Sequence, residues 1–384
     1  MTEHFIATYG ERRIELVTGR GARLTSSEGD EYVDLVAGIA VSSLGHGHPA
    51  LAASIAEQAD RLIHVSNLYH TRPACDLAAR LYELTGGMRS FFCNSGAEAV
   101  EAALKIARKL GAETGRSRIV CAEGSFHGRT LGALSATGQP GKREAFHPLL
   151  EGFVHVPYGD ADALQTELEG DVAAVLIEPI QGEAGVVVPP EGYLTDAASA
   201  CRDAGALFML DEVQTGVART GRWWAHQHEG VSPDVMTLAK GLGGGLPIGA
   251  CLAGPAAAGV LGPGDHASTF GGGPVQCAAA LTVLDVIEDG GLVEHGSHLG
   301  KLALEQLADG LDGCDVRGRG LLIGVELPRD RAAEVVEGCA RRGVLVNNAT
   351  PNVLRIAPPL VIEGDELSEA LEVVVEVCGE VAAA

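Results

Sequence analysis

Lysine is scarce in this chain of 384 residues, and basic residues of both kinds are outnumbered by acidic ones. Only five of the 28 basic residues are lysines, so each lysine can be considered individually. Against these 28 stand 51 Asp and Glu residues, which gives a formal net charge of −23. A field of this sign repels phosphate backbones and anionic lipid surfaces, so we expect neither a nucleic acid nor a membrane as a partner.

The nine cysteines form no redox or metal-binding pattern. The nearest two, Cys75 and Cys93, are 18 positions apart, which excludes a CxxC pair and does not fit a secreted disulfide framework. His46 and His48 have no further ligand types nearby, so no metal site is predicted. No apolar run approaches the roughly 18 residues of a membrane span, and the N-terminus lacks an apolar signal segment. We expect a cytoplasmic protein.

Short apolar segments alternate with longer amphipathic ones, which predicts an α/β fold with parallel strands joined by helices. Several of the short segments are apolar on both faces, as strands between two helical layers must be. The six candidate strands of this region are Ser90–Cys93, Arg118–Ala122, Val172–Pro179, Ala206–Asp211, Val235–Ala239 and Ile248–Ala253.

The C-terminal hundred residues have a different character. Two strand-like segments, 321–326 and 353–356, lie between two helices with one apolar face. Those faces are formed by Cys277, Leu281, Leu284 and Ile287, and by Leu367, Leu371, Val374, Cys378 and Val381. We therefore predict a large domain over 51–276, a small α+β domain over 277–384, and an N-terminal segment, 1–50, that packs with the small domain.

A phosphate group could bind where an apolar strand gives way to a helix at Asn94-Ser95-Gly96. Unpaired N–H groups and the positive end of the helix dipole favour an anion there, Gly96 allows close approach, and Ser95 adds a hydroxyl donor. An ordinary serine N-cap explains the same residues, and this motif alone favours that alternative.

Two charged residues directly follow apolar strands. Asp211 would be a buried carboxylate, which needs a cationic partner from the protein or a ligand. A glycosidase pair of Asp211 and Glu212 is disfavoured, because successive strand residues point to opposite faces. Lys240 precedes a glycine-rich turn, and a lysine at the edge of a core has a lowered pKa and can act as a nucleophile or form a Schiff base. The alternative is a lysine that snorkels from the strand end.

The remaining lysines look different from Lys240. Helical or polar surroundings suggest that all of them are solvated: Lys105, Lys109, Lys142 and Lys301. A glycine-flanked loop provides Phe126, which could stack on a flat ring, and Arg129, whose planar fork suits a carboxylate. Phe126 could equally be a core residue, and Arg129 could form a structural ion pair.

Pyridoxal phosphate requires this combination: a lysine, an acid for the pyridinium nitrogen, a partner for the ring face and a phosphate site. Motifs that support the same interpretation extend over nearly the whole chain: DEYVDLVAGIAVSSLGHGHPAL, FFCNSGAEA, FHGRT, IEPIQGEAGV, DEVQTGVARTG, LAKGLGGGLPIGA, STFGGGP and LRIAPPL. With these motifs the chain resembles the class III, fold type I aminotransferases. The motifs are less specific for the substrate, because relatives acting on ornithine, succinylornithine, 4-aminobutyrate and lysine-pathway amines share most of them.

The resemblance implies a role for each matching cofactor residue. Lys240 would carry pyridoxal phosphate as an imine and move the substrate proton, and Asp211 would pair with the ring nitrogen. Gln214 would contact the ring hydroxyl, with Val213 and Phe126 on the two ring faces. The phosphate would be held by Ser95, Gly96 and Ala97, and by Thr269 of the neighbouring subunit. The implied active unit is a homodimer with shared sites.

The resemblance also implies transamination of an ω-amine, N-acetylornithine above all, with 2-oxoglutarate. Arg129 would bind the α-carboxylate of the amino donor, and Ser268 lies where the family touches it. Arg355 would bind the α-carboxylate of 2-oxoglutarate, and Glu183 would pair with Arg355 while the donor is bound. The chain departs from the family at Gly273 and Val100, where asparagine is usual, so local hydrogen bonds there are expected to differ.

Overall fold

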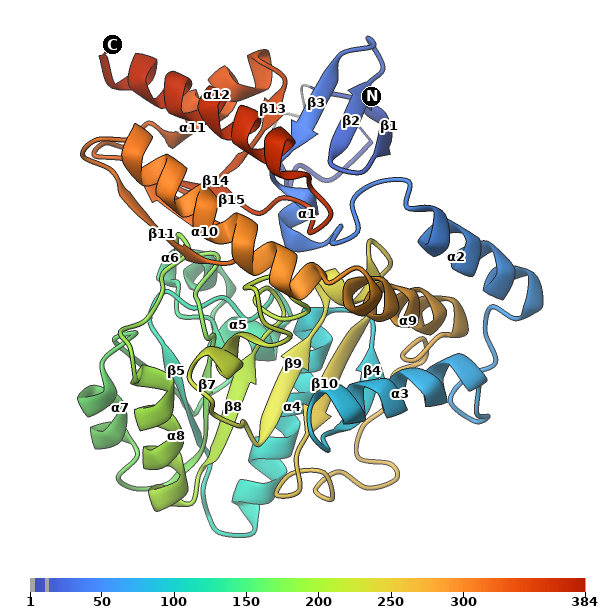
Figure 1. Cartoon of the computed structure of the whole chain (residues 1–384). Coiled ribbons are helices and arrows are strands. Elements are labelled where there is room, and N and C mark those ends of the chain that lie inside the picture. The colour runs from blue at the N-terminus through green and yellow to red at the C-terminus, as the bar shows by residue number, and fades with distance from the viewer. Residues whose placement is uncertain (1–3, 11–13, 384) are drawn as a thin grey trace.

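The structure is a computed structural model, which describes residues 4–10 and 14–383. Its centre is a seven-stranded sheet with the strand order β4-β10-β9-β8-β7-β5-β6 (Figure 1). In that order the strands are Arg89–Cys93, Gly249–Ala253, Val235–Leu238, Leu207–Asp211, Val172–Ile177, Arg118–Ala122 and Phe153–Val156. The predicted α/β class is confirmed, and six of the seven strands coincide with predicted segments.

The direction of one strand differs from a simple parallel arrangement. β10 pairs antiparallel with both β4 and β9, whereas the other neighbours are parallel. Composition does not reveal this direction, because β10 is buried on both faces like its parallel neighbours. As a result the loop before β10 lies at the same edge of the sheet as the loops that follow β4, β8 and β9.

Alternate residues of the central strands face two different helical layers. On one face, Leu176 and Met209 pack in a cluster with Val100 and other residues of α4 (Gly96–Ala112). On the opposite face, Ile177 packs with α7 (Ala161–Glu167) and α8 (Tyr193–Ala204). Burial on both sides explains why these strands are continuous apolar runs.

A second layer, which we call the C-terminal layer, consists of an antiparallel sheet and three helices. The sheet has the order β11-β12-β15-β14, formed by Asp315–Arg319, Leu322–Glu326, Val353–Ile356 and Asn347–Thr350. The helices are α10 (Leu292–Gly310), α11 (Ala332–Arg341) and α12 (Gly364–Ala383). Of the apolar face predicted for α12, Leu367, Leu371, Val374 and Cys378 are buried and Val381 is partly buried.

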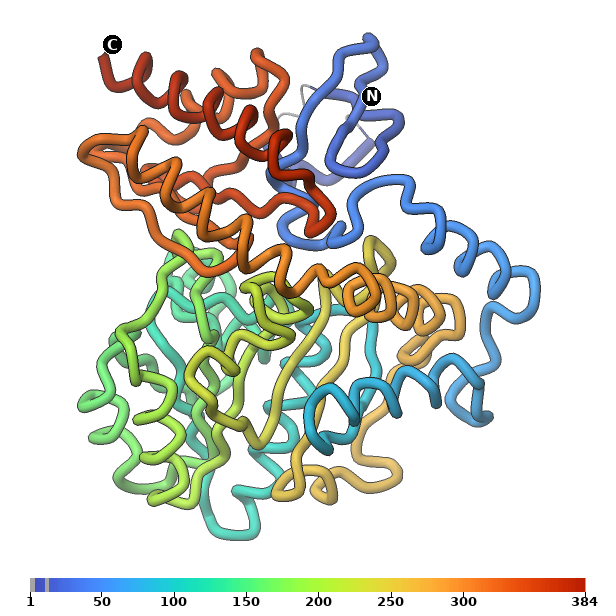
Figure 2. Tube along the Cα trace, in the orientation of Figure 1, coloured from blue at the N-terminus to red at the C-terminus, as the bar shows by residue number. Residues whose placement is uncertain are grey.

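Three further helices connect the two layers, and short one-turn helices lie in the loops. α9 (Pro274–Asp289) packs against α2 (Pro49–Arg61), α3 (Arg72–Leu84) and α10. The shorter elements are α1 (Ala37–Ala40), α5 (Leu131–Ala136), α6 (Pro140–Arg143), η1 (Glu144–Phe146), η2 (Ala225–His228) and η3 (Lys240–Gly243). Figure 2 shows the chain passing from the N-terminal strands down through α2 and α3 into the large sheet, and returning upward through α9 and α10.

The N-terminal strands form a small sheet together with a strand from near the other end of the chain. Its order is β1-β2-β3-β13, from Leu16–Arg20, Arg23–Ser26, Glu31–Asp34 and Val344–Leu345. β3 and β13 pair in parallel, with Val33 opposite Val344. The predicted domain boundaries at residues 50 and 276 stay a prediction, because one buried cluster extends from the large sheet through α9 into the C-terminal layer.

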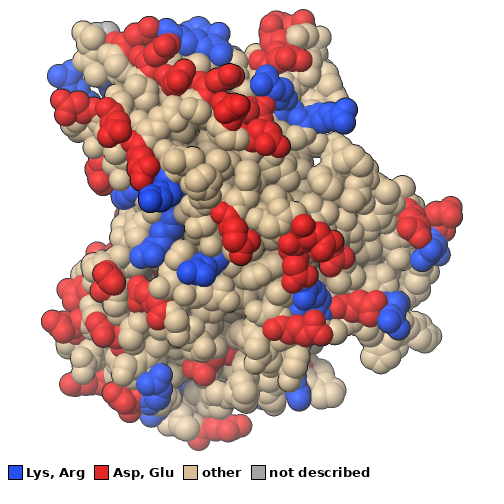
Figure 3. All heavy atoms as spheres, viewed as in Figure 1, with Lys and Arg blue, Asp and Glu red and all other residues tan. Residues whose placement is uncertain are grey.

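Acidic side chains are spread over the face shown in Figure 3 rather than gathered in one tail. None of the helices in the described part of the chain has both the length and the apolar character that crossing a membrane requires.

Burial in the central sheet gives a stability prediction. Leu176 is fully buried in β7, so its replacement by alanine should cost about 2–5 kcal/mol of unfolding free energy. Leu302, which is 47% exposed on α10, provides the control, because L302A removes the same atoms without leaving a cavity. Equilibrium denaturation of the two variants should separate them clearly, and equal losses would contradict the packing described.

Candidate active site

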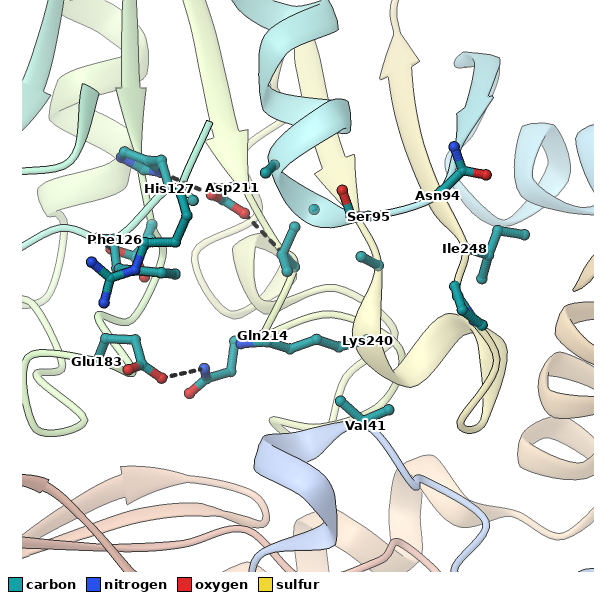
Figure 4. A pocket seen from close by; sticks show the side chains of 18 of the residues that line it. Val41, Asn94, Ser95, Phe126, His127, Glu183, Asp211, Gln214, Lys240 and Ile248 are labelled. Atoms are coloured by element: carbon teal, nitrogen blue, oxygen red, sulfur yellow. Dashed lines mark hydrogen bonds and ion pairs between the residues drawn. The ribbon is translucent and has the colours of Figure 1, made fainter. Parts of the chain in front are cut away.

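Loops that follow five strands meet at the carboxyl edge of the large sheet and enclose a cavity of about 430 Å³ (Figure 4). Ligands of α/β sheets bind at this edge, and the volume suits a small molecule. The cavity is lined by most of the residues that the sequence singled out, namely Ser95, Gly96, Ala97, Phe126, Arg129, Glu183, Asp211, Val213, Gln214 and Lys240.

The start of α4 leaves backbone donors available to an anion. Ser95 caps the helix, because its Oγ accepts the N–H of Glu98 at 3.2 Å. The N–H groups of Gly96 and Ala97 have no hydrogen-bond partner among residues 4–10 and 14–383. A Cβ at position 96 would lie 2.8 Å from Cγ1 of Val213, so glycine is needed to keep this approach open. The serine cap and an anion site are therefore compatible.

Asp211 ends β8 with its carboxylate fixed by three contacts. Oδ2 lies 2.8 Å from Nδ1 of His127, and Oδ1 accepts the hydroxyl of Thr237 and the N–H of Val213, both at 3.0 Å. These bonds offset the desolvation of a side chain that is 4% exposed. The sequence analysis did not select His127. Two signals could have identified it: Asp211 needs a partner, and His127 directly follows Phe126.

Glu178 is a second residue of the cavity that the sequence analysis missed. It directly follows β7, and its Oε2 accepts the backbone N–H of Phe126 at 3.0 Å. Burial raises the pKa of the Glu178 carboxyl well above its ordinary value, and the nearby Asp211 carboxylate adds to the effect. A neutral carboxyl can still accept the Phe126 bond and so hold this loop in place. A charged residue inside an otherwise apolar segment was the signal available in the sequence.

Lys240 follows β9 and projects into the cavity (Figure 4). Burial lowers the pKa of its ammonium group to about 8, although the carboxylate of Glu183 opposes the shift. Its backbone has a φ of 41°, a conformation that is rare for residues other than glycine and is often found at functional sites. The chain thus contains, inside this cavity, a lysine whose pKa is lowered toward the neutral range.

Arg355, from β15 of the C-terminal layer, contacts two residues that line the cavity, Glu183 and Gln214. Its Nη1 donates to Oε1 of Glu183 at 2.5 Å, to Oε1 of Gln214 at 3.2 Å and to the carbonyl of Gly182 at 3.3 Å. Burial alone would raise the pKa of Glu183, but the charge and hydrogen bond of Arg355 outweigh it and lower the pKa to about 2. Glu183 is therefore ionised across the physiological range.

Two cations lie against the ring of Phe126. Cζ of Arg129 is 5.5 Å from the ring centroid, and Nζ of Lys142 is 4.6 Å from it. The prediction that Lys142 is solvated is wrong, because α6 places this side chain, half-buried, beside the ring. Burial lowers the pKa of Lys142, and the carboxylate of Glu183 is the strongest opposing influence.

Ser268 and Thr269 do not line this cavity in the single chain. Oγ of Ser268 accepts from Nδ2 of Asn94 at 3.2 Å, and Asn94 is part of the cavity wall. Thr269 is exposed and lines a separate hollow of about 300 Å³, together with residues of the 64–78 segment. Arg355 does not line the cavity either, but it contacts the lining residues Glu183 and Gln214, and the other predicted site residues line the cavity within one chain.

The two departures from the family pattern have different surroundings. Val100 is fully buried in the apolar cluster between α4 and the sheet. Gly273 directly precedes α9, and a Cβ there would meet the flexible side chain of Gln276. Neither residue contributes to the cavity.

The donor set fits pyridoxal phosphate. Free N–H groups of Gly96 and Ala97 suit its phosphate, and the fixed carboxylate of Asp211 suits a protonated ring nitrogen. Val213 and Phe126 offer apolar surfaces for the two faces of a flat ring, and Lys240 supplies the amine.

The environment of Lys240 gives a prediction for the cofactor-free protein. Lys240 should react with an amine-selective reagent with a midpoint near pH 8 rather than 10.5. Its proton binds the folded state less tightly than the unfolded chain, so its contribution to stability should increase from about pH 8 to 10.5. Glu183→Gln should lower the midpoint further, because the Glu183 carboxylate stabilises the ammonium. Mass spectrometry of each labelled lysine measures this, with the 77% exposed Lys301 as a reference. A midpoint at 10.5 would contradict the burial of Lys240.

Comparison with known proteins adds independent evidence. The profile of the family described as Aminotransferase class-III matches residues 7–378. An acetylornithine aminotransferase from Corynebacterium efficiens is 49% identical, over 97% of this chain and 94% of that protein. Another from Streptomyces coelicolor is 51% identical, over 94% of this chain and 90% of that protein.

Solved structures agree with the sequence matches. The ornithine aminotransferase from Toxoplasma gondii superposes with a TM-score of 0.96 at 35% identity, covering 100% of this chain and 94% of that one. The acetylornithine aminotransferase from Elizabethkingia anophelis gives 0.87 at 34% identity, covering 98% and 97%. The site lies at the sheet edge, the family profile covers nearly the whole chain, and the relatives share both sequence and fold: this chain belongs to the class III family of fold type I aminotransferases.

Proposed function

We propose that this enzyme transfers the ω-amino group of N2-acetylornithine to 2-oxoglutarate, giving N-acetylglutamate 5-semialdehyde and glutamate. The observations that carry the proposal are a cavity lined by Lys240 and Arg129, and a buried arginine, Arg355, that is paired with the cavity residue Glu183. Relatives named acetylornithine aminotransferase at 49% and 51% identity support this donor. The reaction belongs to arginine biosynthesis, and we propose that it takes place in the cytoplasm.

The proposed cofactor is pyridoxal 5'-phosphate, on which class III aminotransferases depend. When bound, it supplies an electron sink for the substrate carbon that loses a proton. Asp211 would stabilise a positive charge at the ring nitrogen, and the His127 and Thr237 contacts keep its carboxylate in one orientation. Phe126 and Val213 would hold the ring between them, and Gln214 would bind the ring hydroxyl.

Lys240 is the proposed catalytic base. Its pKa of about 8 leaves a useful fraction of the amine neutral at physiological pH, so it can accept the proton from the substrate carbon and return it. The ordinary lysine value of 10.5 would leave almost no base available. Asp211 and Glu183 remain close enough to influence the charge that Lys240 gains.

The two arginines give the cavity its order of substrates. Arg129 binds the α-carboxylate of the donor, with Ser268 nearby, which leaves the distal amine at Lys240. The Glu183 carboxylate neutralises Arg355 at this stage, so an α-amino acid has no second carboxylate site. The α-carboxylate of 2-oxoglutarate then replaces Glu183 on Arg355, because a bidentate arginine fork suits a carboxylate.

We propose a homodimer as the active unit, with Thr269 of each subunit completing the phosphate site of the other. Thr269 lies outside the cavity of its own chain. It adjoins large exposed apolar residues, of which Phe270 is 64% and Tyr69 is 70% exposed. Both adjoin the hollow at Thr269, and exposed apolar patches are typical of interaction sites.

Spectroscopy of one half-reaction tests the donor. Purified holoprotein mixed with N-acetylornithine, without keto acid, should lose its cofactor absorbance band rapidly, and 2-oxoglutarate should restore it. Succinylornithine, ornithine and 4-aminobutyrate serve as comparison donors at equal concentration. If one of them bleaches the band and N-acetylornithine does not, the proposed donor is wrong although the reaction class stands.

Replacing Glu183, whose carboxylate neutralises Arg355, tests the proposed order of substrates. Glu183→Ala should let glutamate compete as a donor, raising its kcat/KM relative to N-acetylornithine by about tenfold or more, since a freed buried arginine attracts its carboxylate. Glu183→Asp, which keeps the charge, is the matched control. An unchanged ratio of the two kcat/KM values in the alanine variant would refute the masking role.

A further inference from the structure

Lys142 is a cation beside the active-site cavity, and it has no role in the reaction proposed above. Its Nζ lies 4.6 Å from the centroid of Phe126, a ring that lines the cavity. Within the described ranges 4–10 and 14–383, the Lys142 ammonium has no carboxylate partner and no side-chain hydrogen bond. The Lys142 ammonium is therefore an unpaired cation that a carboxylate entering this side of the cavity can approach.

Glu183 is the more exposed and less tightly held member of the ion pair with Arg355. The side chain of Glu183 is 22% exposed, whereas that of Arg355 is 2% exposed. Arg355 is also held by the carbonyl of Gly182 and by Gln214, which fix its guanidinium when Glu183 leaves. The carboxylate must therefore move away from the arginine, and not the arginine from the carboxylate.

A displaced Glu183 needs another cation in this partly buried cavity. Arg355 lowers the pKa of Glu183 to about 2, and a carboxylate that leaves such a partner without replacement loses this stabilisation. Lys240 is the proposed base of the reaction and acts in its neutral form, and Arg129 is engaged with the other carboxylate of the keto acid. Lys142 is the cation that remains, and the Glu183 carboxylate is the charge that acts on it most strongly.

We propose that Lys142 is the second partner of Glu183: it receives the carboxylate when 2-oxoglutarate takes Arg355, and returns it when the amino donor binds. Lys142 is thus a positioning residue that acts through Glu183 and sets the affinity for the keto acid. It is neither a catalytic residue nor a ligand of the donor. This inference rests on the proposed alternation between the two substrates.

A dicarboxylate that cannot react measures the effect of Lys142 on keto-acid binding separately from its effect on the reaction rate. Glutarate has the two carboxylates of 2-oxoglutarate and no keto group, so its dissociation constant can be measured by calorimetry on the holoprotein. Lys142→Met, which keeps the aliphatic stem against Phe126, should weaken glutarate binding by about tenfold. Lys142→Arg should stay within about twofold of the unchanged protein, because it keeps the charge. Lys301→Met makes the same change at a site that is 77% exposed, and should have no effect.

The loss of glutarate affinity in Lys142→Met must depend on the Glu183 carboxylate. The Glu183→Gln variant has no carboxylate at position 183 for Lys142 to bind. In this background Lys142→Met should therefore change glutarate affinity by less than about twofold. The KM for N-acetylornithine should be the same with Met or Lys at position 142, because the donor leaves the Glu183–Arg355 pair intact. Lys142→Gln provides a second neutral variant should the methionine variant fail to fold.

Three results would overturn the inference. Unchanged glutarate affinity in both neutral variants removes the role altogether. A larger effect on the donor than on glutarate makes Lys142 a ligand of the donor carboxylate beside Arg129. An undiminished effect in the Glu183→Gln background shows that Lys142 attracts the keto acid directly. Failure of the unchanged protein to use N-acetylornithine would instead refute the proposed donor, and the glutarate measurements would still stand.

Discussion

The ion pair of Arg355 and Glu183 connects the C-terminal layer to the large sheet. Arg355 belongs to β15 and is 2% exposed, so its charge would be intolerable there without a carboxylate close by. Glu183 comes from the loop after β7 and meets it at 2.5 Å. In the proposed function the same contact decides which carboxylate the cavity accepts. The pair therefore adds a charged contact to the apolar cluster that joins the two layers.

The other charges of the cavity are balanced around this pair. Lys240 is held near a pKa of about 8 because burial opposes its charge while Glu183 partly supports it. Asp211 keeps its carboxylate in place through His127, and Glu178 holds the Phe126 loop from the neighbouring strand end. Each of these groups follows a strand of the large sheet. The parallel direction of those strands brings residues that are distant in sequence to one edge.

Much of this arrangement could be predicted from the sequence, and particular residues show where prediction ended. Asp211 and Lys240 stand out because each directly follows an apolar run, a local signal that needs no tertiary information. His127, Glu178 and Lys142 do not stand out, because their significance comes from contacts with residues 84, 52 and 16 positions away, respectively. The solvated environment predicted for Lys142 is wrong for the same reason, since a polar local sequence gives no information on how α6 folds back onto Phe126.

Some strands of the fold could likewise be predicted from the sequence, and others could not. Long apolar strands such as β5 and β7 are predicted almost to the residue, because burial on two faces determines their composition. β6 is missed, since it has only four residues and includes a histidine, and β14 is missed because Asn347 and Asn348 are untypical of strands. The direction of β10 depends on its partners β4 and β9, and its own residues do not encode it.

The most direct test of the account is to locate the cofactor on the chain. Holoprotein treated with borohydride and then digested should yield one phosphopyridoxyl-modified peptide by mass spectrometry, with the modification on Lys240. Lys142 is the informative competitor, because its ammonium lies 4.6 Å from the ring of Phe126, which lines the same cavity as Lys240. A modification on Lys142, or none on any lysine after saturation with pyridoxal phosphate, would contradict the assignment of this cavity and of the chemistry proposed for it.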